Sequence, residues 1–140
     1  EISECLVGSE MCIRDSSRMR TIFKTGEDVE VVVRYEVKEP IKDAVFGMAI
    51  YDSQGLHCYG TNTKIDRLDD FDVTKSGEVH LLMPKFDLLP EVYVLDVSIE
   101  CETALPVDYY RQAYRFEMTN VIEEVGRFRL EHSWEIKEAE

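Results

Sequence analysis

Alternation of apolar and polar side chains is the feature that most constrains the fold of this chain. Residues 28–37 read DVEVVVRYEV, and one face of this segment would carry Val29, Val31, Val33, Tyr35 and Val37. Residues 91–103 read EVYVLDVSIECET, and one face would carry Tyr93, Leu95, Val97, Ile99 and Cys101. A period of two with many β-branched side chains is typical of half-buried antiparallel strands. Both segments are therefore predicted to be strands.

Further strands are predicted where short apolar runs alternate with turn signals. They are residues 18–23, 45–51, 56–63, 78–84, 112–119 and 126–136. Gly55 can adopt a positive φ and closes a predicted hairpin turn over residues 52–55. In the last segment the inward face would hold Phe128, Leu130, His132, Trp134 and Ile136. Seven to eight short strands without a long helix predict an all-β fold, an antiparallel β-sandwich of immunoglobulin-like or jelly-roll type.

The first 17 residues do not follow this pattern. They read EISECLVGSEMCIRDSS, which has no sustained period, and residues 7–16 resemble translated sequencing-adapter read-through. We expect residues 1–17 to be a non-native or disordered leader, and the natural chain to continue further towards the N-terminus. Residues 18–140 would form one domain, since 140 residues suit a single core.

The charge balance restricts the partners. The chain carries 29 acidic and 16 basic residues, a net charge of −13. Nucleic acids and anionic membrane surfaces bind basic faces, so neither is expected as a partner. No apolar run approaches the roughly 20 residues of a membrane span, and no signal peptide is recognisable. A cytoplasmic location is expected.

The reactive residues do not form a recognisable catalytic or metal motif. Nucleotide-binding P-loop, GxSxG and HExxH motifs are absent, so no enzyme activity is expected. Cys58 and Cys101 lie in predicted strands and are interpreted as free thiols, with a disulfide between them as the alternative. The aspartates of the 65–77 loop do not have EF-hand spacing, which favours a solvated loop over a calcium site. Neither a metal nor a cofactor is predicted.

Four short pieces of the sequence together resemble a known family. They are FKTGE at 23–27, VFGMAIYDSQG at 45–55, YGTNT at 59–63 and RFRLEHSWE at 127–135. In this order they resemble the C-terminal domain of the nucleotide-binding subunit of polysaccharide ABC exporters, the Wzt C-terminal family. The resemblance implies a non-catalytic β-sandwich that recognises an O-antigen-type polysaccharide for export.

The resemblance also implies the partners. It suggests a homodimer with the last strand exchanged between protomers, positioned at the inner face of the plasma membrane. The membrane channel subunit would be a partner of the full-length protein, whose ATPase activity would belong to an N-terminal domain outside this chain. The alternative hypothesis is a structural or protein–protein interaction β-sandwich without a glycan site.

Candidate sugar-binding residues are aromatic side chains and planar or hydroxyl-bearing polar groups. The predicted set is Tyr59, Thr61, Asn62, Thr63, Asp66, Arg34, Asp96 and Trp134, with Tyr51, Tyr109 and Tyr110 as further stacking candidates. Asn62 and Thr63 could instead close a turn, and Trp134 could belong to the core. Asp96, Ser98 and Glu100 form a polar stripe, either a solvated sheet face or a concave surface that cradles sugars.

Overall fold

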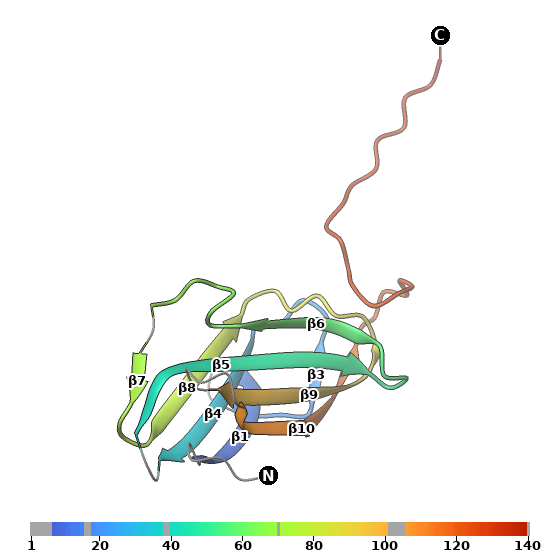
Figure 1. Cartoon of the computed structure of the whole chain (residues 1–140). Helices are drawn as coiled ribbons and strands as arrows, with labels where there is room; N and C mark the ends of the chain where they lie inside the picture. Colours follow the sequence, from blue (N-terminus) through green and yellow to red (C-terminus); the bar gives the residue numbers. More distant parts are fainter. Residues whose placement is uncertain (1–6, 16–17, 38–39, 70, 101–105, 140) are drawn as a thin grey trace.

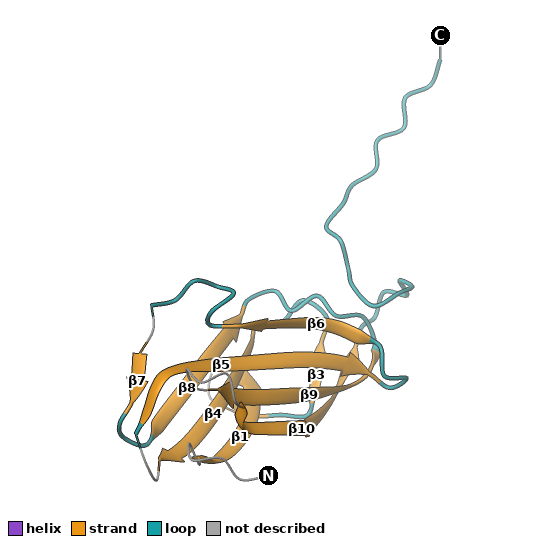
Figure 2. Ribbon diagram, viewed as in Figure 1, coloured by secondary structure: helices purple, strands orange, loops and turns teal. Residues whose placement is uncertain are grey.

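The computed structural model describes residues 7–15, 18–37, 40–69, 71–100 and 106–139, with side chains from residue 20 onward except those of 71 and 106–108. These residues form strands and loops arranged as two packed β-sheets (Figures 1 and 2). Nowhere in these ranges is there a helix long and apolar enough to cross a membrane.

The larger sheet has six strands. Its order is β3 (Ile22–Lys24), β10 (Pro106–Thr119), β9 (Glu91–Glu100), β5 (Ile41–Asp52) and β6 (His57–Asn62), while β7 (Phe71–Val73) pairs with the start of β5. β3 runs parallel to β10, and the other pairs are antiparallel. Gly55, at φ +87°, closes the predicted hairpin between β5 and β6.

The smaller sheet has four strands. Its order is β2 (Arg18–Met19), β1 (Val7–Asp15), β4 (Val29–Val37) and β8 (Gly77–Met83), all antiparallel. β8 is therefore one edge of the sandwich, and β6 is an edge of the facing sheet.

The core lies between the sheets, as the alternation predicts. Val31 of β4, Ile50 of β5 and Tyr93 of β9 are almost or fully buried in one cluster. Phe116 stacks on Tyr93 with ring centroids 5.5 Å apart. Complete burial of a large apolar side chain is worth about 1.5–3 kcal/mol, so these rows supply much of the driving force that joins the sheets.

The predicted fold class is confirmed: the chain is an all-β sandwich. The described residues form ten strands rather than seven or eight. β1 and the short β7 were not predicted, residues 18–23 divide into β2 and β3, and the predicted strand at 126–136 is not formed.

Residues 7–15 lie within the segment that was expected to be a disordered leader. The structure instead pairs them with β4, from Val7 opposite Val37 to Arg14 opposite Glu30. Backbone pairing along a sheet needs no period in the side chains, which is why the sequence pattern did not reveal this strand. The structure thus describes a strand over residues 7–15, and the expectation of a non-native or disordered leader stays a prediction.

The predicted strand at 126–136 does not form within the single chain. Phe128 makes one isolated bridge with Leu88, and the segment then extends away from the sandwich (Figure 1). Trp134 and Ile136 are 87% and 88% exposed, so they do not join the core as expected. An alternating sequence needs a neighbouring strand to pair with, and this chain folded alone gives the segment none beyond Phe128 among the described residues.

Candidate functional site

The YGTNT residues, 59–63, lie at the end of β6 and just beyond it, and they mostly stabilise the loop that follows. The Thr61 hydroxyl donates to Asp66 Oδ1 at 3.0 Å, and the Ile65 amide donates to Asn62 Oδ1 at 2.6 Å. Tyr59 is 51% exposed on the edge strand. The alternative in which Asn62 closes a turn is therefore correct for its carbonyl oxygen, while its amide NH₂ is still a potential donor.

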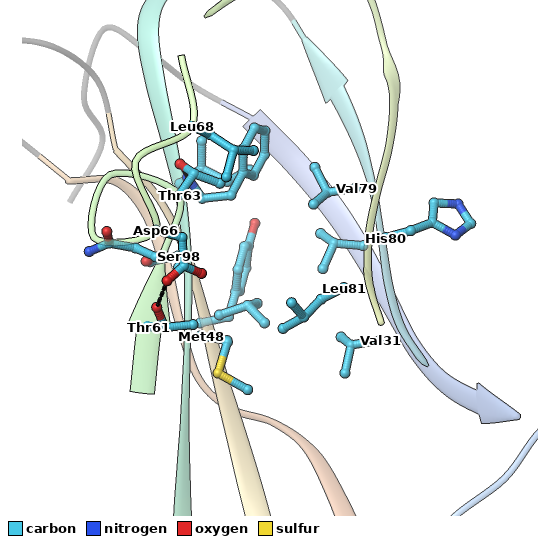
Figure 3. A pocket seen from close by; sticks show the side chains of 17 residues that line it. Val31, Met48, Thr61, Thr63, Asp66, Leu68, Val79, His80, Leu81 and Ser98 are labelled. Atoms are coloured by element: carbon cyan, nitrogen blue, oxygen red, sulfur yellow. Dashed lines mark hydrogen bonds between the residues drawn. The ribbon is translucent and has the colours of Figure 1, made fainter. Parts of the chain in front are cut away.

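Thr63 and Asp66 line a cavity of about 180 Å³ between the sheets. Val31, Val79 and Leu81 face Met48 across it, while the His80 ring points away (Figure 3). The Thr63 hydroxyl already accepts a hydrogen bond from the Phe46 amide at 3.2 Å. A sugar hydroxyl in this apolar cavity would lose hydration without a compensating partner, so the cavity is a poor sugar site.

The first of two outer hollows, of about 270 Å³, lies on the outer face of the six-stranded sheet. Its floor is made of small residues from three neighbouring strands: Gly47 and Ala49 of β5, Gly60 of β6 and Ser98 of β9. A Cβ atom on Gly47 would lie 2.8 Å from Ser98 Oγ and 3.3 Å from Asn62 Cβ. The depth of this hollow therefore depends on glycine at position 47.

Asp96 and Tyr109 form one rim of this outer hollow. Asp96 is only 6% exposed, and its two carboxylate oxygens accept hydrogen bonds from the Tyr109 hydroxyl at 3.0 Å and the Gln112 amide at 2.7 Å. Burial raises the pKa of Tyr109, and the hydrogen bond to Asp96 raises it further. The Tyr109 ring is 47% exposed, so Asp96 fixes an aromatic group that remains accessible.

The fixed tyrosine depends on an irregularity in β10. Tyr110 pairs with Val97, and the next registered pair is Tyr114 with Leu95. Three residues of β10 thus lie opposite Asp96 alone, which is a bulge. The Asp96 carboxylate binds the backbone of this bulge through Gln112.

A larger hollow, of about 650 Å³, continues along the same face. It shares Asp96 and Tyr109 with the first outer hollow and extends to Tyr51, Arg111 and Arg115. Tyr51 stacks on His57 of β6, with ring centroids 4.6 Å apart. The two hollows together give a continuous polar and aromatic surface across the outer face.

The structure brings together only part of the predicted set. Thr61, Asn62, Thr63 and Asp66 together line the cavity between the sheets, and Thr61 and Asn62 also line the first outer hollow with Asp96. Arg34 lies on β4 of the other sheet and pairs with Glu78 at 2.8 Å. Trp134 lies in the exposed C-terminal segment.

Sequence reasoning missed the floor of the hollow. Gly47 and Ala49 alternate with the buried Phe46, Met48 and Ile50. This alternation of small and large residues along one strand was the available signal. The bulge in β10 had no such signal, because register irregularities arise from pairing with a distant strand.

Comparison with known proteins identifies the family. The sequence model of the Wzt C-terminal domain matches residues 9–130. The chain belongs to the Wzt C-terminal domain family. The crystal structure of a Wzt C-terminal domain superposes with a TM-score of 0.79 at 17% identity, covering 96% of this chain and 89% of the other.

A second solved structure is similar to this Wzt-type domain over only a part of its own length. It is the Pseudomonas fluorescens alkylpurine DNA glycosylase AlkC bound to DNA containing an abasic site analogue, with a TM-score of 0.51 and 16% identity. The similarity covers 82% of this chain and 31% of AlkC, and it concerns the fold alone. A search among curated proteins gave no match. Membership of the Wzt family identifies the chain as a domain of an O-antigen ABC exporter subunit.

Proposed function

We propose that this domain recognises an O-antigen-type polysaccharide through the outer face of its six-stranded sheet. The observation that carries the proposal is the hollow floored by Gly47, Ala49, Gly60 and Ser98 beside the fixed ring of Tyr109. Family membership supports the substrate class, because the family belongs to exporters of such polysaccharides.

The chemistry of the hollow suits a sugar ring. An exposed aromatic face packs against the C–H face of a pyranose, and a floor without large side chains lets the ring approach the backbone. The Ser98 hydroxyl and the Asn62 amide NH₂ provide hydrogen-bonding groups for the sugar hydroxyls. Asp96 acts as a positioning residue, since its oxygens are already engaged by Tyr109 and Gln112.

The domain would act within a larger assembly. ATP hydrolysis would belong to a nucleotide-binding domain outside this chain, and the membrane channel subunit would receive the polysaccharide. The domain would then work on the cytoplasmic side of the plasma membrane. The family resemblance supports each of these partners.

The C-terminal segment supports a homodimer. Leu130, Trp134 and Ile136 alternate along the chain and are 77–88% exposed. β6 and β8 are edge strands, which offer unpaired backbone groups to an incoming strand. Exchange of residues 130–136 between two copies would cover these side chains without any change in the sandwich.

Titration of the domain with polysaccharide from its source cell tests the glycan site. We expect saturable NMR shifts around Gly47, Ser98 and Tyr109, and none with a non-cognate glycan. Tyr109→Ala should weaken binding about tenfold or more, by loss of the stacking surface. Leu82→Ala is the control, because Leu82 is 66% exposed on β8 of the other sheet and lines neither outer hollow.

A protein–protein interaction module is the second candidate function. The exposed apolar side chains of the C-terminal segment favour it. Absence of any shift at millimolar concentrations of the source polysaccharide would reject glycan recognition by this domain and favour the second candidate.

A further inference from the structure

Two arginines on β10 lie in the larger outer hollow without a carboxylate partner. Arg111 and Arg115 both line this hollow and both side chains are exposed. Within the part of the chain that the structure describes, neither forms an ion pair. In a chain with a net charge of −13, cationic side chains have many carboxylates available, so two unpaired arginines in one hollow call for an explanation.

Four of the five other arginines whose side chains the structure describes form ion pairs, and the exception is Arg67 in the loop after β6. Arg20 pairs with Glu27 at 3.0 Å, and Arg127 pairs with Asp52 at 2.9 Å. Arg34 and Arg129 are likewise paired with glutamates. What distinguishes Arg111 and Arg115 is that two exposed guanidinium groups without an ion pair line the same hollow.

The carboxylates in the same hollow do not neutralise these arginines. Asp52 and Asp96 line it, but they are only 4% and 6% exposed. Asp52 accepts hydrogen bonds from the Gln54 and Leu56 amides and from Arg127, and Asp96 accepts from Tyr109 and Gln112. The acidic oxygens are nearly buried and engaged in hydrogen bonds, while the two arginine side chains remain exposed to solvent.

The bulge in β10 determines where Arg111 lies. Gln112 has a φ of +51°, a conformation that non-glycine residues rarely adopt, and its amide is held by Asp96 at 2.7 Å. Arg111 lies over the Tyr109 ring, with the guanidinium carbon 5.8 Å from the ring centroid. The same bulge thus positions a cation on one side of the ring, and a sugar would stack on the other side.

We propose that the larger outer hollow binds an anionic group of the polysaccharide, a carboxylate or a phosphate on a sugar next to the one stacked on Tyr109. This inference rests on the proposed glycan recognition and adds the charge of the ligand. Guanidinium groups bind both anions through two parallel hydrogen bonds, and such charge-assisted bonds are about twice as strong as neutral ones.

Calorimetric titration of the full 140-residue chain tests the proposal. The probes are polysaccharide from the source cell in three forms: native, carboxyl-reduced, and treated with aqueous hydrofluoric acid to remove phosphate. We expect one of the two treatments to weaken binding about tenfold or more, and that treatment identifies the anion. The double variant R111Q/R115Q should weaken binding of the native form by a similar factor and bind native and treated forms equally.

Lys75→Gln provides the matched control, because it removes one exposed positive charge outside both hollows. It should leave binding unchanged. Equal binding of the native form by wild type and R111Q/R115Q would overturn the anionic site and leave glycan recognition intact. Equal binding of all three polysaccharide forms by wild type would overturn it as well. Failure of wild type to bind any form would overturn the proposed function and this inference together.

Discussion

Arg127 donates a hydrogen bond from Nε to Oδ2 of Asp52 at 2.9 Å, and this contact joins residues 75 positions apart in the sequence. The other oxygen of Asp52 accepts from the amides of Gln54 and Leu56, which shapes the turn between β5 and β6. One buried carboxylate therefore connects the central hairpin to the start of the C-terminal segment.

Asp52 should make the stability of the domain depend on pH in the acidic range. The Leu56 amide, and next the Arg127 guanidinium, hold the pKa of Asp52 below its usual value of 3.8. A lowered folded-state pKa stabilises the fold fully above the unfolded-state value, and this contribution is lost as pH falls through the folded-state pKa. Asp52→Asn should lower the Tm at pH 7. It should also make the Tm decrease less as the pH falls below about 4. Thermal unfolding between pH 2.5 and 7 measures both effects, and parallel curves for the two proteins would contradict this role.

Tyr93 should contribute through its hydroxyl as well as its ring. It is fully buried, and its hydroxyl donates to the Leu89 carbonyl at 2.6 Å. Tyr93→Phe leaves that buried carbonyl without this donor, which should cost about 1–3 kcal/mol. Urea unfolding with an unchanged m-value checks the prediction. Tyr59→Phe, at an exposed edge position, serves as the control and should change the free energy of unfolding by less than about 0.5 kcal/mol.

Local pattern predicted the fold because side-chain alternation and sheet burial share the same period. The rows through Val31 and Tyr93 are buried as predicted, and Gly55 adopts the positive φ that its turn requires. The segment at 126–136 carries the same kind of pattern but extends into solvent. Alternation indicates that a segment is suited to a sheet, and it does not say which chain provides the neighbouring strand.

The candidate site was predictable only in part, because side chains acquire roles from distant partners. Asp96 was identified from its polar stripe, but its hydrogen bonds to Tyr109 and Gln112 depend on the register between β9 and β10. Arg34 was grouped with Asp96 by residue type, yet it lies on the opposite sheet. No local sequence pattern predicts the register shift or which strand belongs to which sheet.

His80 should remain protonated to a higher pH than an ordinary histidine. Its Nδ1 lies 2.8 Å from Glu30 and its Nε2 lies 2.7 Å from Glu78. Hydrogen bonds to Glu30 and then Glu78 raise the pKa of His80 above 6.5. A raised folded-state pKa stabilises the fold fully below the unfolded-state value, and this contribution is lost as pH rises through the folded-state pKa.

An NMR titration of the His80 ring measures this shift directly. Glu30→Gln should lower the pKa of His80, because it removes the first of the two acceptor charges. Glu36→Gln, on the same strand but not in contact with His80, should leave it unchanged. An identical His80 titration in wild type and Glu30→Gln would contradict the prediction.

Gly47→Ala should reduce glycan binding while the domain stays folded. The added methyl group would lie 2.8 Å from Ser98 Oγ and fill the floor of the first outer hollow. We expect a loss of stability of about 1–2 kcal/mol from overpacking, and binding of the source polysaccharide weakened about tenfold. Adding Ser98→Ala should restore stability by removing the close contact, but the hollow remains filled. Recovery of binding together with stability would therefore contradict a role for the hollow.

The C-terminal segment should report dimerisation through Trp134, the single tryptophan of the chain. In one copy this side chain is 87% exposed, so a monomer should emit at the wavelength of a solvent-exposed indole. Exchange of the segment would bury it, and the emission should shift to shorter wavelength as concentration rises, together with a doubled mass in sedimentation. Deletion of residues 131–140 should give a monomer at all concentrations. Val121→Ala combined with Val125→Ala, which removes exposed apolar surface outside the segment, should leave the dimer intact. A wild-type monomer with exposed-type emission at about 0.5 mM would contradict strand exchange, since an exchange dimer of this kind should bury at least about 1,000 Å².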